Sequence, residues 1–243
     1  MKEQPGIANG AGGTLEDAAA TVAPNPELEG LATSVELTLA SVLQGIALAI
    51  LIPKIVELIT SGEVSKLPYI PASLLLLFMV WVTFISHAIS FITWPFDPLH
   101  NLMYFLIVSS EAVLLFFLDK PVQWFLSLFG FGVLVGFSCW YNQGLLRRNA
   151  SRYATAAARA LYEHIMDEQR VSLQFMAGYC LVGLAGFGAL QVRPELGMAQ
   201  ELGWVITGLG AMVLPLVNVL WQARMMARRA RLIEQVKANP VTL

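Results

Sequence analysis

The chain has 243 residues, of which 56% are hydrophobic and 13% are charged, and its formal net charge is −2. Soluble domains carry about 25% charged residues. The composition therefore excludes an ordinary soluble domain and indicates an integral membrane protein whose main partner is the lipid bilayer. We expect no nucleic-acid partner.

Motifs that support catalysis are missing from the sequence, which holds no CxxC, HExxH, P-loop or GxSxG pattern. The two cysteines, Cys139 and Cys180, lie in apolar runs. There we expect small buried side chains rather than a disulfide or a metal pair. The sequence thus predicts a protein that is not an enzyme and that has no cofactor or metal.

Residues 1–30 are rich in glycine, alanine, proline and acidic residues. They lack the apolar core of a signal peptide, and they offer too little apolar surface to fold alone. We expect them to form a flexible acidic tail ahead of the membrane domain.

Six apolar runs follow the tail. A helix of about 20 mostly apolar residues spans a bilayer core of about 30 Å. The runs therefore predict an all-α, polytopic membrane protein with six transmembrane helices within residues 31–223. The runs cover residues 32–57, 70–93, 98–118, 121–143, 171–191 and 202–222.

Arginine is concentrated in two segments, residues 144–170 and the basic tail 224–243. We expect 144–170 to be a helical cytoplasmic segment. The positive-inside rule then places both termini in the cytoplasm, and we expect a bacterial inner membrane. The arginines either anchor this topology or bind anionic lipid headgroups. The lipid candidates are Arg147, Arg148, Arg152, Arg228 and Arg229.

One carboxyl group is predicted deep in the membrane. Glu111 lies about eight residues from the outer end of the third run, so roughly 12 Å deep. Ionisable groups in lipid are costly and usually face the protein interior or water. Glu111 is therefore either a cation or proton site, or a neutral or paired carboxyl that ties helices together. Ser109 and Ser110 are local partners for it.

Two histidines flank the turn between the second and third runs. His87 lies near the end of the second run, and His100 begins the third. No carboxylate or cysteine set completes a metal site, so we expect a hydrogen-bonded pair that stabilises the turn with Asp97. Glu36, at the start of the first run, is expected to be an interfacial or capping carboxylate.

The first run carries spaced polar residues in its first half. Thr38, Ser41 and Gln44 recur in steps of three, which predicts a slowly drifting polar stripe. Above them the run is apolar, with Ile46 and Ile50. A polar vestibule below an apolar constriction is how a dewetting gate would be built. An ordinary helix contact with a few hydrogen bonds has the same pattern.

The first three runs also match a known family loosely. Leu39-Ala40-Ser41 stands where that family has a Phe-Ser-Asp motif, and the stretch Val42–Leu48 follows with a similar pattern. In these features the chain resembles, distantly, the endolysosomal potassium channel family and its bacterial homologues. Further similar positions are Trp81 and His87 late in the second run and His100-Asn101-Leu102 opening the third.

The resemblance implies six-helix units that assemble around a pore lined by apolar residues of the first helix, here Ile46 and Ile50. The Phe and Asp of the motif are absent, so potassium selectivity is not implied. We predict an oligomeric, ion-channel-like protein with the first helix lining a pore. The alternative is a non-conducting accessory or scaffold subunit of a larger membrane protein complex. A transporter or enzyme centred on Glu111 and the histidines is a third hypothesis.

Overall fold

The computed structural model describes residues 26–88, 98–148, 150–153, 155–191 and 197–238. Within these ranges the chain is built of helices and short turns, with no strand. The all-α prediction is therefore confirmed. The helices are α2 (Pro26–Ser61), η1 (Val64–Lys66), α3 (Tyr69–Ala88), α4 (Pro98–Phe116), α5 (Pro121–Arg148), η2 (Ala150–Arg152), α6 (Ala156–Gln191) and α7 (Gly197–Ala238).

Five stretches of the described chain are long and apolar enough to cross a membrane, which makes this a helical membrane protein by length and composition. They lie in α2, in η1 with α3, and in α5, α6 and α7. The apolar part of α4, Leu102–Phe116, is shorter.

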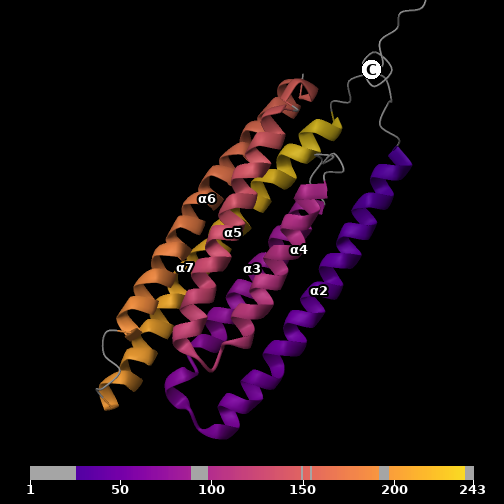
Figure 1. Cartoon of the computed structure of the whole chain (residues 1–243). Helices are drawn as coiled ribbons and strands as arrows, with labels where there is room; N and C mark the ends of the chain where they lie inside the picture. Colours follow the sequence, from indigo (N-terminus) through magenta and orange to yellow (C-terminus); the bar gives the residue numbers. More distant parts are fainter. Residues whose placement is uncertain (1–25, 89–97, 149, 154, 192–196, 239–243) are drawn as a thin grey trace, which may run out of the picture.

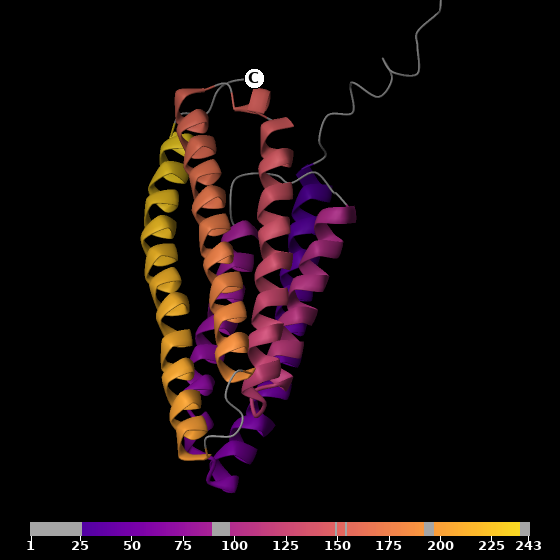
Figure 2. The same cartoon turned by 60° about the vertical axis from the view of Figure 1, so that its left-hand side comes forward.

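The six long helices run alternately up and down, side by side (Figures 1 and 2). The beginning of α2 and the end of α7 consequently lie at the same end of the bundle (Figure 1). We call this the terminal end and the opposite one the far end. Gly62 ends α2 with a φ of 71°, a conformation that glycine adopts without steric cost. The chain can therefore reverse into η1 and α3.

An aromatic cluster fills the core toward the far end. The Tyr69 ring meets Trp124 and Phe125 edge to face, at centroid distances of 5.3 and 5.9 Å. Trp124 Nε1 donates a hydrogen bond to Ser73 Oγ over 3.1 Å, and the Tyr69 hydroxyl lies 2.7 Å from that of Thr207. These contacts join α3, α5 and α7.

Helices α5 and α6 approach each other through glycines. A Cβ added at Gly183 would lie 2.7 Å from the backbone nitrogen of Phe129, and one at Gly186 would lie 2.4 Å from the Phe125 ring. On the facing helix, a Cβ at Gly132 would lie 2.9 Å from Cys180 Sγ. Small residues let membrane helices pack this closely.

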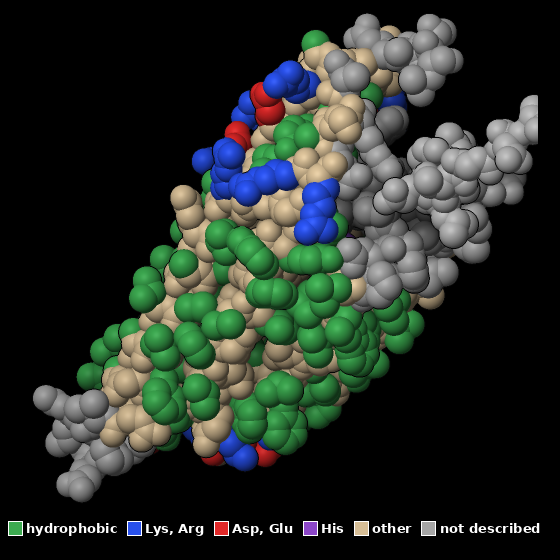
Figure 3. Space-filling view, turned by 45° about the horizontal axis from the view of Figure 1, so that its top comes forward, with side chains coloured by type: hydrophobic (Ala, Val, Ile, Leu, Met, Phe, Trp, Pro, Cys, Tyr) green, Lys and Arg blue, Asp and Glu red, His purple; other side chains and the backbone are tan. Residues whose placement is uncertain are grey.

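Charged side chains divide between the two ends of the bundle. Figure 3 shows lysine and arginine gathered beyond a broad hydrophobic belt, with a smaller charged group opposite. At the far end, Lys54 pairs with Glu57 and Asp119, and Lys66 pairs with Glu63. At the terminal end, Arg147, Arg148 and Arg228 are exposed.

Beyond the belt, α5, α6 and α7 continue together, and they bury a second small core. Residues 144–170 form the end of α5, then η2, then the start of α6. The core residues are Leu146, Leu161, Ile165 and Met166, with Leu232, Ile233 and Val236 packed against them.

Candidate functional site

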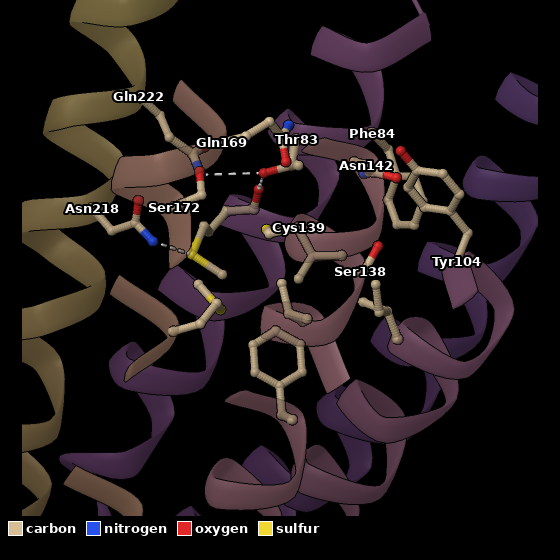
Figure 4. A pocket seen from close by; sticks show the side chains of 16 residues that line it. Thr83, Phe84, Tyr104, Ser138, Cys139, Asn142, Gln169, Ser172, Asn218 and Gln222 are labelled. Carbon is tan, nitrogen blue, oxygen red and sulfur yellow. Dashed lines mark hydrogen bonds between the residues drawn. The ribbon is translucent and has the colours of Figure 1, made fainter. Parts of the chain in front are cut away.

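A cavity of about 70 Å³, lined by both apolar and polar side chains, lies between α3, α4, α5, α6 and α7 (Figure 4). One water needs about 10–15 Å³ of such volume, so the space accommodates several waters or one small solute. Polar side chains in a membrane bundle usually mark functional sites or tie helices together. The polar side chains lining the cavity are Thr83, Tyr104, Ser138, Asn142, Gln169, Ser172, Asn218 and Gln222.

Helical spacing brings these side chains to the cavity in pairs. Residues three or four positions apart share one face of a helix. Three helices each present such a pair to the cavity, and α3 adds Thr83. The pairs are Ser138 with Asn142 on α5, Gln169 with Ser172 on α6, and Asn218 with Gln222 on α7.

The amides of α7 use their nitrogens in hydrogen bonds and leave their oxygens without partners among the described residues. Gln222 Nε2 donates to Thr83 Oγ1 over 3.2 Å. Asn218 Nδ2 donates to Met79 Sδ over 2.8 Å and lies 3.4 Å from the Tyr179 hydroxyl. Within the described part of the chain, neither Asn218 Oδ1 nor Gln222 Oε1 accepts a hydrogen bond. Two residues that line the cavity therefore each hold a buried acceptor without a partner.

His100 is linked to the cavity by a hydrogen bond to Asn142, one of the lining residues. Its side chain is 2% exposed, and Nδ1 donates to Asn142 Oδ1 over 2.9 Å. The Tyr104 ring meets the imidazole edge to face at 4.5 Å. The sequence predicted a pairing with His87 and Asp97. The side chains of both lie outside the described residues, so this pairing stays a prediction; among the described residues, Asn142 of α5 is a partner of His100.

A second hollow, of about 40 Å³, lies beside the cavity, and a buried ion pair contributes to its lining. Arg229 is 7% exposed, and its guanidinium bonds Glu168 of α6 and both the carbonyl, at 2.8 Å, and the hydroxyl of Ser86 on α3. His164 Nε2 lies 3.1 Å from Glu168 Oε1 and 3.2 Å from the Met225 carbonyl. The two hollows share lining from Thr83, Gln169, Ser172 and Gln222.

This network changes the interpretation of one predicted lipid ligand. Arg229 points into the bundle and neutralises Glu168, so its guanidinium is turned away from lipid headgroups. Arg147, Arg148 and Arg228 stay at the surface. The side chain of Arg152 lies outside the described residues.

Glu111 and Gln44 form a separate polar pair near the edge of the bundle. Gln44 Nε2 of α2 donates to Glu111 Oε2 of α4 over 3.1 Å, and the two residues are 5% and 1% exposed. Ser109 and Ser110, expected as partners of Glu111, instead donate to the carbonyls of Phe105 and Ile107. Glu111 therefore ties α4 to α2.

The other candidates on α2 occupy different environments. Thr38 is exposed and donates to the Ser34 carbonyl over 2.9 Å, and Ser41 is exposed as well. Ile46 is 50% exposed, whereas Ile50 is half-buried against the core. Thr38 and Ser41 thus share an exposed surface with Ile46, while Gln44 faces the bundle. The side chain of Glu36 is outside the described residues.

Metal-ligating side chains do not gather in the described ranges, where no group of three His, Cys, Asp or Glu could hold an ion. Comparison with protein-family models, with curated proteins and with solved structures finds no match to this chain. The likeness to the potassium channel family stays a prediction.

Proposed function

We propose that this protein is a six-span membrane transporter, with both termini in the cytoplasm, that binds a small neutral solute rich in hydrogen-bond donors. The observation that carries the proposal is the cavity, two of whose lining residues, Asn218 and Gln222, each hold an unpartnered side-chain carbonyl oxygen inside an apolar bundle. A concave, mostly apolar space with a few convergent polar groups is the usual form of a small-molecule site.

Charge in the site favours a neutral solute. The one guanidinium that lines the neighbouring hollow, Arg229, is already paired with Glu168. The remaining polar lining of the cavity consists of amides and hydroxyls. An ion entering this space would lose its hydration shell without meeting an opposite charge, which is costly.

The two ends of the bundle support an alternating-access mechanism. Toward the far end the core is closed by Phe131, Phe125, Trp124 and Tyr69, all at most 2% exposed. The cavity lies on the other side of this aromatic block, nearer the basic segments that we assign to the cytoplasm by the positive-inside rule. With this assignment, the proposed transporter would be in a state closed toward the outside. Passage of a solute then requires these aromatic side chains to move apart.

Solute flux into proteoliposomes tests the proposal. Osmotic swelling with urea or glycerol is expected in vesicles holding the wild-type protein. Asn218→Leu and Gln222→Leu should lower it at least tenfold, because each removes an acceptor. Gln174→Leu makes the same change on the exposed face of α6 and should leave flux unchanged. Equal swelling in all four samples and in empty vesicles contradicts transport through the cavity.

A second candidate function is an ion-conducting pore between subunits, lined by α2. One side of α2 is exposed from Val42 to Ile59, which leaves this part of the helix available to other copies of the chain. The exposed residues are Val42, Ile46, Ile52, Val56 and Ile59. Contact with lipid alone also explains an exposed apolar face, so we rank this candidate second.

Ionic conductance separates the two candidates. A pore lined by α2 predicts that Ile46→Asn raises conductance in planar bilayers, whereas Asn218→Leu does not affect it. Transport through the cavity predicts that Asn218→Leu lowers the rate of swelling, whereas Ile46→Asn leaves it unchanged. Absence of both fluxes, together with a stoichiometric partner in purified material, would favour the accessory-subunit hypothesis.

A further inference from the structure

The Glu111–Gln44 pair lacks a hydrogen-bond donor. The amide of Gln44 gives one N–H to Glu111 Oε2. Two oxygens remain, Gln44 Oε1 and Glu111 Oε1, both buried and neither accepting a bond from any described residue. Buried acceptors are nearly always satisfied in native proteins. A proton on Glu111 Oε1 supplies the missing donor.

Carboxylic acids and primary amides are complementary in this form. The protonated acid donates its O–H to the amide oxygen while its other oxygen accepts the amide N–H. Two hydrogen bonds then join Glu111 and Gln44, where an ionised carboxylate could form one. The second bond also satisfies both unpartnered oxygens at once.

Cations near Glu111 are engaged elsewhere. On α2, Lys54 lies ten residues from Gln44, about 15 Å along the helix. Its Nζ contacts Glu57 at 3.0 Å and Asp119 at 3.1 Å. Lys54 therefore belongs to the charged group at the far end, and it does not neutralise Glu111.

The other helices that pack on α4 bring no countercharge to Glu111. Neither α3 nor α5 ahead of Arg147 contains Lys, Arg, Asp or Glu. On α4 itself, His100 bonds Asn142 more than two turns away, next to Tyr104. The remaining titratable residues of α3 and α5 are Tyr69, His87, Cys139 and Tyr141. An ionised carboxylate without a cation is costly in such a place.

We propose that Glu111 is a proton-binding site, occupied at neutral pH, whose proton completes a two-bond acid–amide pair fastening α2 to α4. The inference does not depend on the cavity or on its solute. Release of the proton leaves a bare carboxylate against Gln44 and removes one of the two bonds. The proton therefore controls how firmly α2 is attached to the bundle.

Infrared spectroscopy of the reconstituted full-length protein tests the proton directly. Wild-type protein at neutral pH should show the C=O stretch of a protonated carboxyl, and Glu111→Gln should abolish it. Glu57→Gln removes an exposed carboxylate from α2 and should leave the band intact. A wild-type spectrum without the band, or a band that survives Glu111→Gln, overturns the proposal.

A second variant tests the partner. Gln44→Leu removes the amide that donates to Glu111, so the band should persist at a higher wavenumber, since its C=O accepts one bond fewer. An unshifted band would show that Gln44 does not bond the protonated acid. Glu111→Gln is expected to fold because two amides can also form a paired set of bonds. If it does not fold, the Gln44→Leu shift still decides the question.

Discussion

Arg229–Glu168 and Gln44–Glu111 are both buried polar pairs that join helices, yet they differ in charge and in surroundings. The first is an ion pair beside a polar hollow, and it is supported by Ser86 and His164. The second is a lone acid–amide pair between α2 and α4 with no cation beside it. A charged carboxylate is kept where a guanidinium and further hydrogen bonds compensate it. Where they are missing, a neutral acid is the stable form.

The largest effect is expected from breaking the ion pair. Arg229→Met leaves Glu168 buried without its cation, and removal of one partner of a buried pair costs about 3–5 kcal/mol. We expect a large drop in thermal stability in detergent, or failure to accumulate. The double variant Arg229→Met with Glu168→Met should recover most of the loss, and the exposed Arg228→Met should cost little. Equal damage from Arg228→Met would contradict the buried pairing.

A packing variant, Gly183→Ala, provides a loss of stability that involves no polar group, for comparison with Arg229→Met. In Gly183→Ala the new methyl would lie 2.7 Å from the backbone nitrogen of Phe129, which cannot rotate away. Overpacking of this kind costs about 1–3 kcal/mol. Gly188→Ala, whose Cβ meets nothing within 4 Å, is the matched control. Equal melting temperatures for the two variants would mean that α5 and α6 are not packed through Gly183.

Rising pH should weaken the neutral pair. If the folded protein holds a proton on Glu111 that the unfolded chain releases, this contribution to stability is full below the ordinary glutamate pKa of about 4.3. It then declines, by at most about 1.4 kcal/mol per pH unit, until the pH at which the folded protein also releases the proton, and above that pH it levels off. Glu111→Gln has no proton to lose and should show a flatter profile over the range in which the wild type declines. Parallel melting curves of the two proteins from acid through neutral to alkaline pH would argue against a bound proton.

The smallest effect is expected at the amide. Gln44→Leu removes hydrogen bonds between membrane helices, which average about 0.6 kcal/mol each, while Glu111 stays neutral. We expect a slight loss of thermal stability at neutral pH and a larger one in alkali. A loss as large as that of Arg229→Met would imply that Glu111 is charged in the folded protein.

The apolar runs predicted the helices well, because a stretch of about 20 apolar residues has few other stable states. They could not predict which faces of the helices meet. Arg228 and Arg229 are neighbours in a basic segment, and the sequence treated both as surface residues. Consecutive helical residues point about 100° apart. Since α7 stays helical to Ala238, one of them is exposed and the other is buried.

The polar residues of the first apolar run show the same limit of prediction from sequence. Steps of three residues fall short of a full turn, so Thr38 and Gln44 lie about 120° apart around α2. The structure places Thr38 outside and Gln44 against Glu111. The cavity was missed although its signal was present, because polar pairs four apart, such as Asn218 with Gln222, occur inside apolar runs. Which pairs converge depends on packing between helices, which no single run contains.

The aromatic block at the far end gives the molecule an optical reporter. Trp124 is fully buried, and its indole is held by Ser73 and the Tyr69 ring. Indole emission moves to longer wavelengths when water reaches the ring. If the block parts during transport, the emission contributed by Trp124, isolated by comparison with Trp124→Phe, should shift to the red upon addition of solute. Trp124, which helps to close the far end, would thus report each opening as a shift of its emission wavelength.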